Sequence, residues 1–151
     1  MKIEVISADA MQALGAQVGA LLQGGEVIVL IGDIGAGKTT FTKGLARALG
    51  VDEDVQSPTF TINRIYDTST DLVLSHYDFY RLQDAGVLKA ELAESVSMRS
   101  NITVIEWAEV VADVLPTDSL QITLHTQADD SRIVEFTARG DRSHQIVERL
   151  S

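Results

Sequence analysis

The stretch GDIGAGKT, from Gly32 to Thr39, decides the fold of this chain of 151 residues. It satisfies the pattern GxxxxGK(S/T), and it stands between the apolar run Val27–Ile31 and a segment whose apolar residues recur at helical spacing. Glycines let successive backbone N–H groups surround phosphate oxygens, and the N-terminus of the following helix attracts negative charge. The sequence therefore predicts a phosphate-binding loop between a buried strand and a helix.

The residues that close this loop predict how a nucleoside triphosphate would be bound. Lys38 is expected to reach the β and γ phosphates as a point charge, and Thr39 to give its hydroxyl to magnesium. Thr40 is expected to contact a phosphate nearer the nucleoside. The backbone N–H groups of the loop come from Gly35, Ala36 and Gly37. We also expect Lys38 to be exposed to the ligand and to contribute little to the core.

Helical spacing of apolar residues predicts helices on both sides of the loop. Either Ser7 or Asp9 is able to cap the first helix, and Asp84 is predicted to cap a later one. The predicted helices span Ser7 or Asp9 to Gly24, Lys38 to Gly50, Asp84 to Glu94, one or two turns in Glu109–Leu115, and a short C-terminal segment around Ile146–Leu150.

Apolar runs and alternating patterns predict the strands of a mixed sheet. The strands span Glu26–Ile31, Thr59–Tyr66, Leu72–Asp78, Ile102–Ile105 with Glu106 at its end, 120–124 and 134–138. The connection 67–71 is too short for a crossover helix, so its two strands should be antiparallel, and the last two strands should form a second hairpin. The predicted fold class is therefore α/β, a P-loop NTPase-like three-layer fold with a mixed parallel and antiparallel sheet, in a single domain over residues 1–151.

Composition and charge exclude several function classes. The net charge is −10, from 22 acids against 12 bases, whereas nucleic-acid binding depends on Lys and Arg that neutralise phosphates. We therefore expect no contact with DNA, and contact with RNA only through another protein. The absence of cysteine excludes disulfides and thiolate metal sites. Because no signal-like N-terminus and no long apolar run occurs, the expected location is the cytoplasm, without membrane contact.

Two acids, Asp78 and Glu106, stand where predicted strands end. Such an acid commonly completes the magnesium site of P-loop proteins, and Glu106 would also be able to orient or deprotonate water. The alternative is a solvated strand terminus, but the nearby loop favours a functional role for at least one. Thr59, in the strand entry Ser57–Thr59, either lines the γ-phosphate side or only starts a strand. The predicted catalytic residues are Glu106, Asp78 and Lys38, and the predicted metal ligands are Thr39, Glu106 and Asp78.

The remaining candidates carry a weaker signal. Trp107 either packs over the site or is a core residue, and the core interpretation is favoured. Arg132 is able to approach phosphate from the last hairpin, although an exposed turn arginine is the commoner arrangement. His76, His125 and His144 have no partner at metal-ligand spacing and are interpreted as isolated strand or surface residues.

Four segments together carry a resemblance to a known family. They are GDIGAGKTTFTKGLARALG at Gly32–Gly50, SPTF at Ser57–Phe60, HYDFYRL at His76–Leu82 and IEW at Ile105–Trp107. Their order and identity resemble the TsaE family, from the N-terminal helix to the last hairpin. The four motifs in this order are far more specific than the phosphate loop alone.

The resemblance implies an ATPase that serves bacterial synthesis of threonylcarbamoyladenosine on tRNA. It implies TsaB and TsaD as protein partners, tRNA contact only through them, and turnover that is weak alone and resets the complex between cycles. In the family pattern the loop Thr and the Glu of the EW motif coordinate magnesium, which points to Thr39 and Glu106, and the Asp of HxDxYR matches Asp78. Adenine is favoured as the base mainly by this resemblance, since no NKxD guanine signature occurs.

Two other function classes stay open from the residues alone. A nucleotide-sensing binding module would change shape with bound phosphate without needing hydrolysis. A small-molecule kinase would transfer the γ-phosphate to an acceptor other than water, but no arginine-rich lid supports this in the sequence.

Overall fold

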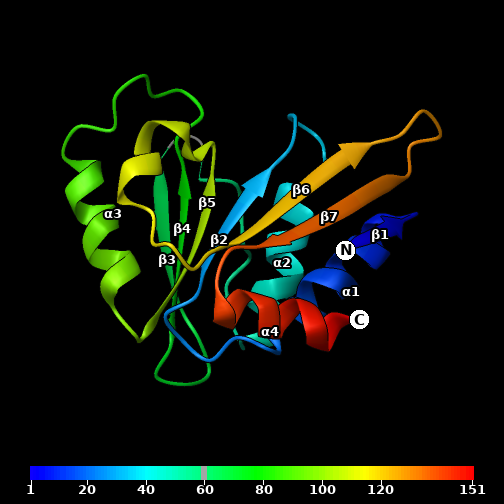
Figure 1. The fold of residues 1–151 in the computed structure, drawn as a ribbon, viewed down its shortest axis with the longest axis horizontal. Coiled ribbons are helices and arrows are strands. Elements are labelled where there is room, and N and C mark those ends of the chain that lie inside the picture. Colours follow the sequence, from blue (N-terminus) through cyan, green and yellow to red (C-terminus); the bar gives the residue numbers. More distant parts are fainter. Residues whose placement is uncertain (59–60) are drawn as a thin grey trace.

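Within the part of the chain that the computed structural model describes, seven strands form one mixed β-sheet. Figure 1 shows how this sheet runs through the molecule. The structure describes residues 1–58 and 61–151. The strands are β1 (Lys2–Val5), β2 (Val27–Ile31), β3 (Asn63–Asp67), β4 (Val73–Asp78), β5 (Asn101–Glu106), β6 (Leu120–Thr126) and β7 (Arg132–Ala138). Their order across the sheet is β1-β7-β6-β2-β5-β4-β3.

The central strands of this sheet pair in parallel, and the strands toward its two edges pair antiparallel. The central strand β2 is parallel to both β5 and β6, and β5 is parallel to β4. The predicted hairpins β3–β4 and β6–β7 are antiparallel, as is the edge pair β1–β7. The prediction of an α/β fold with a mixed sheet is confirmed.

Helices cover both faces of the sheet (Figure 1). They are α1 (Ala8–Gly19), α2 (Lys38–Ala48), α3 (Leu88–Ser97), the 3₁₀ helix η1 (Ala108–Val114) and α4 (Asp141–Leu150). Ile28 and Leu30 of β2 face the core that contains α1 and α2, whereas Val27 and Val29 face the core that contains α3 and η1. Because β2 is buried on both sides, its sequence is a continuous apolar run rather than an alternating one.

Close contact between α1 and α2 fixes the direction in which α2 leaves the phosphate loop. A Cβ atom on Gly15 of α1 would overlap the carbonyl oxygen of Phe41, and one on Gly44 of α2 would overlap that of Gln12. Only glycine permits this approach of the two backbones. The N-terminus of α2 is thereby held against a rigid neighbour at the end of β2.

The structure corrects the N-terminal boundaries. Ser7, and not Asp9, caps α1, since its Oγ accepts the N–H of Ala10 at 3.0 Å. The helix ends at Gly19 instead of Gly24, because the carboxylate of Glu26 takes up backbone N–H groups in the following turn. Strand β1 had no sequence signal, because four residues at a sheet edge are too few for an alternating pattern.

Two boundaries in the middle of the chain also differ from the prediction. Asp84 does not cap α3: its carboxylate accepts the N–H of Gly86, whose φ of 55° interrupts any helix before Leu88. The helix then continues to residue 97, past the predicted end at 94. Strand β3 begins at Asn63, since Ile62 has a φ of 69° and is not extended. Within the described ranges, no helix is long and apolar enough to cross a membrane.

Candidate nucleotide-binding site

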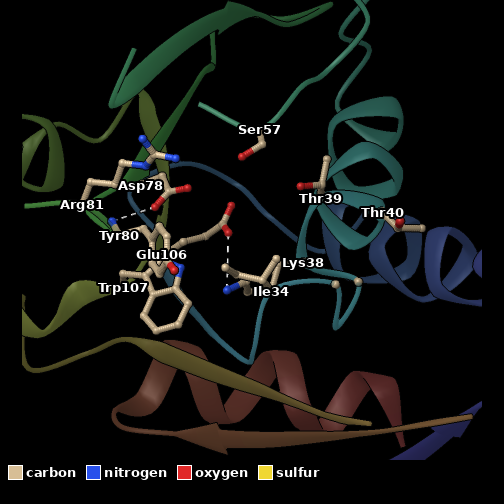
Figure 2. Close-up of a pocket in the computed structure, with 12 residues that line it drawn as sticks. Ile34, Lys38, Thr39, Thr40, Ser57, Asp78, Tyr80, Arg81, Glu106 and Trp107 are labelled. Atoms are coloured by element: carbon tan, nitrogen blue, oxygen red, sulfur yellow. Dashed lines mark hydrogen bonds and ion pairs between the residues drawn. The ribbon is translucent and has the colours of Figure 1, made fainter. Parts of the chain in front are cut away.

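The phosphate loop lines a cleft of about 430 Å³ at the carboxyl ends of β2, β4 and β5 (Figure 2). In parallel sheets with helices on both faces, ligands bind at this edge. The predicted residues that line the cleft are Gly35, Gly37, Lys38, Thr39, Thr40, Asp78, Glu106 and Trp107. Residues from three separate segments of the chain therefore meet at the place where the loop motif predicted a ligand.

Positive φ angles shape the loop as the motif requires. Gly35 has a φ of 84° and Gly37 a φ of 109°. Nothing lies within 4 Å of a Cβ built on Gly35, so conformation rather than space demands glycine there. Gly37 is the N-cap of α2 and has no side chain with which to cap the helix. The first N–H groups of α2 therefore depend on a ligand or solvent for hydrogen bonds.

Lys38 is more enclosed than the sequence suggested, with only 7% of its surface exposed. Its Nζ donates a hydrogen bond to the carbonyl oxygen of Gly32 at 2.6 Å and lies 3.8 Å from Glu106 Oε1. The ammonium also lies 4.3 Å from the ring centroid of Trp107. Lys38 lines the cleft as expected of a residue that faces the ligand, but its side chain folds back over the loop and is held by more contacts than expected.

The two strand-end acids are neighbours in the sheet. Asp78 and Glu106 are directly opposite each other in the parallel register of β4 and β5, so their side chains lie on the same face. They are only 4% and 3% exposed, respectively. Asp78 Oδ1 accepts the backbone N–H of Tyr80 at 2.9 Å, and a dashed line in Figure 2 joins Glu106 to Lys38. Both acids are therefore buried members of the cleft, and the alternative of solvated strand termini is wrong.

His76 also belongs to this cluster, which the sequence analysis missed. Its ring is fully buried, and Nε2 lies 2.7 Å from Glu106 Oε2. The interpretation of His76 as isolated is therefore wrong. The missed signal was the two-residue period of a strand, which puts His76 on the same face as Asp78. His125 is exposed on β6 and His144 bonds its own helix through Gly140, in agreement with their interpretation as strand or surface residues.

Trp107 forms a wall of the cleft as well as part of a core. Its ring lies beneath the Lys38 ammonium and contacts Tyr80, with the two ring centroids 4.9 Å apart. Its φ of 56° is unusual for a bulky residue and turns the chain sharply after β5. The favoured interpretation as a core residue alone is thus incomplete, since Trp107 also packs with η1 and neighbouring side chains.

Arg132 contacts the phosphate loop from outside the main cleft. It lies at the start of β7 and not in the turn, and it donates hydrogen bonds to the carbonyl oxygens of Ala36 at 3.1 Å and Gly35 at 3.3 Å. Arg132 and the loop also line a smaller cleft of about 170 Å³, together with Ser7, Met11 and Thr40. Ala36 lines this smaller cleft and not the main one, and its side chain is buried.

Four further residues of the cleft were not predicted as site residues. Ile34 lines it from the phosphate loop, and Ser57, Tyr80 and Arg81 complete the lining. Tyr80 and Arg81 directly follow Asp78, so the strand-end argument that selected Asp78 also placed them at this edge. Thr59, the remaining predicted contact, lies outside the described residues.

The side chains of the cleft fit a magnesium ion that is shared with a nucleotide. Among the residues that the structure describes, no three or more His, Cys, Asp or Glu side chains are grouped so as to hold a metal by themselves. Magnesium is commonly held by one or two carboxylates together with substrate phosphates and water. The hydroxyl of Thr39 and the carboxylates of Asp78 and Glu106 supply this kind of incomplete oxygen set.

Comparisons with known proteins give the family of the chain. The sequence model of the family described as "Threonylcarbamoyl adenosine biosynthesis protein TsaE" matches residues 5–134. The chain belongs to the TsaE family. The match includes the phosphate loop, both strand-end acids and Trp107.

Relatives and a solved structure extend over nearly the whole chain. A TsaE protein of Bacillus subtilis is 37% identical over 152 residues, covering 100% of this chain and 94% of its own. A TsaE protein of Treponema pallidum is 42% identical over 118 residues, covering 78% of this chain and 86% of its own. The crystal structure of YdiB from Bacillus subtilis superposes with a TM-score of 0.82 at 34% identity, covering 99% of this chain and 93% of that one. The names of both TsaE relatives place those proteins in tRNA threonylcarbamoyladenosine biosynthesis.

Proposed function

We propose that this TsaE-family chain binds ATP with magnesium in the main cleft and hydrolyses it in support of threonylcarbamoyladenosine formation on tRNA. The observation that carries the proposal is the buried pair Asp78–Glu106 beside Lys38 at the phosphate loop. Nucleotide binding alone requires only the loop. A pair of buried acids beside the loop adds groups able to hold magnesium and to activate water.

Four residues of the cleft have a role within this proposal. Lys38 would leave its contact with Gly32 and bind the β and γ phosphates, while Thr39, Asp78 and Glu106 would hold the magnesium ion directly or through water. Magnesium itself, when bound, would neutralise charge on the phosphates. The carboxylate that does not bind the ion directly would accept a proton from the attacking water, or orient it.

The smaller cleft is suited to the nucleoside end of ATP. Thr40 and Gly37 line both clefts, so a chain of phosphates in the loop would lead from one to the other. Met11 offers an apolar surface there, and Arg132 holds the intervening loop in place. Competition binding with ATP and GTP tests the preference for adenine, which the phosphate loop by itself does not read.

The proposed location, protein partners and route to tRNA rest on the family of the chain and on its net charge. The names of the relatives specify tRNA threonylcarbamoyladenosine biosynthesis, and the net charge of −10 opposes direct binding of tRNA. We therefore place the chain in the cytoplasm with TsaB and TsaD as protein partners, and with tRNA contact only through them. Hydrolysis would reset that complex between cycles.

The deciding experiment measures magnesium-dependent ATP turnover by the purified chain, with and without TsaB and TsaD. Glu106→Ala should reduce turnover by about a hundred-fold or more, the usual size of a catalytic acid–base contribution. Glu148→Ala, which removes an exposed acid on α4, serves as the matched control and should leave turnover unchanged. Wild-type turnover in Glu106→Ala would contradict the assignment. Intact tRNA modification by a variant that binds but does not hydrolyse ATP would favour the nucleotide-sensing module instead.

A further inference from the structure

His76 is a buried polar side chain in contact with the proposed active site but without access to the cleft. It lies on β4 with no exposed surface, two residues before Asp78. In the parallel register it is opposite Val104, so Glu106 is its diagonal neighbour on the same face of β5. The ring therefore approaches Glu106 along the face of the sheet, from two residues further from the carboxyl edge that carries the cleft.

The hydrogen bond between these side chains has a defined direction. Nε2 of His76 lies 2.7 Å from Oε2 of Glu106. The ionised carboxylate, which is the form that would hold magnesium, only accepts hydrogen bonds, so in that form His76 is the donor. The other carboxylate oxygen, Oε1, lies 3.8 Å from Lys38 Nζ, which is too long for a hydrogen bond. Of these two contacts, only the one with His76 is short enough to fix the carboxylate in one orientation.

A structural role alone explains this histidine poorly. Nδ1 of His76 is buried and has no hydrogen-bond partner among the described residues. A leucine or methionine would fill the same space without a buried unpaired polar atom, which lowers stability. Residues that break the rules of good core packing are found mainly at functional sites, where their polar groups are needed. His76 is such a residue beside the proposed active site.

We propose that His76 is a positioning residue that holds the Glu106 carboxylate so that Oε1 faces Lys38 and the phosphate loop. The inference rests on the proposed function. When Lys38 turns to the phosphates, Glu106 loses its cationic neighbour, and the hydrogen bond from His76 is left to keep the carboxylate directed at magnesium and water. His76 acts only through Glu106 and does not contact the ligand.

Two substitutions separate positioning from packing. His76→Gln keeps an N–H donor at a similar distance from Cα, whereas His76→Leu removes the donor and keeps the apolar volume. We expect His76→Leu to lower kcat by about ten- to hundred-fold, in line with the loss of a residue that orients a metal ligand, and His76→Gln to restore most of it. Thermal stability should follow the opposite order, since leucine suits the core better than glutamine. If His76→Leu does not fold, His76→Met replaces it.

A second readout does not depend on hydrolysis. Binding of a fluorescent ATP analogue is titrated with magnesium for each variant. His76→Leu should raise the magnesium concentration needed for half-maximal tight binding by about ten-fold or more, and leave binding without magnesium unchanged. The control Thr103→Val removes a buried hydroxyl that bonds Ser95 under α3, so it should lower stability without altering the magnesium dependence.

The outcomes distinguish this inference from the proposed function. His76→Leu with wild-type magnesium dependence and turnover overturns the positioning role, as does a loss of activity that simply follows the melting temperature in both variants. A wild-type chain whose nucleotide binding does not respond to magnesium overturns the proposed function, and the inference with it. The magnesium titration of the wild-type chain alone gives that result, before any variant is measured.

Discussion

Lys38 shows at the scale of one residue why burial and function are hard to separate in a phosphate loop. The side chain is almost fully enclosed, yet it is the residue that the motif assigns to the phosphates. Its ammonium donates a hydrogen bond to the carbonyl of Gly32 and lies over the face of Trp107, which lines the cleft. The positively charged ammonium group therefore lies next to the place where a triphosphate would be bound.

Replacing Lys38 by methionine should separate its two roles. The methionine keeps the apolar stem over Trp107, but it loses the hydrogen bond to Gly32 and the ammonium that lies 3.8 Å from Glu106. A charged hydrogen bond contributes about 1.5–3 kcal/mol, so nucleotide affinity should fall by roughly ten- to hundred-fold or more. Because the same ammonium bonds Gly32 in the free chain, the free energy of unfolding should also fall, by about 1.5–3 kcal/mol.

Binding by calorimetry and denaturant unfolding measure these two effects. Lys43→Met is the matched control, because Lys43 is more exposed and its contact with Asp54 is 3.9 Å long. Such surface pairs contribute little, so Lys43→Met should retain both affinity and stability. Retained affinity in Lys38→Met would contradict the geometry proposed for the phosphates.

For single residues, the sequence predicted which ones lie at the cleft better than it predicted their contacts with other segments of the chain. Asp78 and Glu106 were found because a strand end is visible in a sequence, and the structure puts both in the cleft. The contact of His76 with Glu106 was missed because it depends on which strands are neighbours. Arg132 was assigned to a turn for a related reason: its bonds to the loop span 96 or more positions of sequence.

At the scale of elements, local chemistry predicted most helices and strands but not all their limits. The phosphate loop, β2 and α2 were found because glycines, an apolar run and helical spacing coincide within a short segment. The start of α3 was misplaced because Asp84 forms a tight turn with Gly86, an interaction that resembles a helix cap in sequence. Strand β1 exists because β7 offers it a partner, which no local pattern reveals.

Helix α4 illustrates a cap that is supplied from outside the helix. Its N-cap residue is Gly140, and the carboxylate of Asp118 accepts the N–H groups of Arg142 and Ser143 at 2.9 and 3.2 Å. Asp118 also accepts the hydroxyl of Ser143 at 2.6 Å. Burial alone would raise the pKa of Asp118, but these hydrogen bonds and the nearby Arg142 together lower it below its ordinary value of 3.8.

The lowered pKa of Asp118 predicts an acid-dependent part of the stability. Because the folded pKa lies below the unfolded one, the contribution is fully present above about pH 4 and is lost as the pH falls through the folded pKa. Asp118→Ala should lower the free energy of unfolding by about 1 kcal/mol at pH 7, as for other helix caps, and should weaken the loss of stability below pH 4.

Urea unfolding at a series of pH values between about 2.5 and 7 measures this contribution. Ser143→Ala removes one of the donors and should give an intermediate curve. Parallel curves for wild type and Asp118→Ala over the whole range would show that the cap does not account for the acid sensitivity.

At the scale of the whole molecule, the sequence predicted the classes of element and the hairpins but not the order of the sheet. Hairpins follow from short connections, which are visible in a sequence. The placement of β2 between β5 and β6 depends instead on long crossovers and on the packing of two cores. That order is what brings Asp78, Glu106 and the loop to one edge.

The charge of the whole molecule leads to a last prediction about tRNA. With a net charge of −10, and with Lys38 enclosed in the cleft, the chain repels a polyanion at long range. A tRNA mobility-shift experiment at about 0.15 M salt should therefore give no shift with the chain alone, with or without ATP and magnesium. Addition of TsaB and TsaD should bring the chain into a complex that contains tRNA. A shift by the chain alone that weakens steeply with salt would reveal direct phosphate contacts and would contradict a route to tRNA through partners.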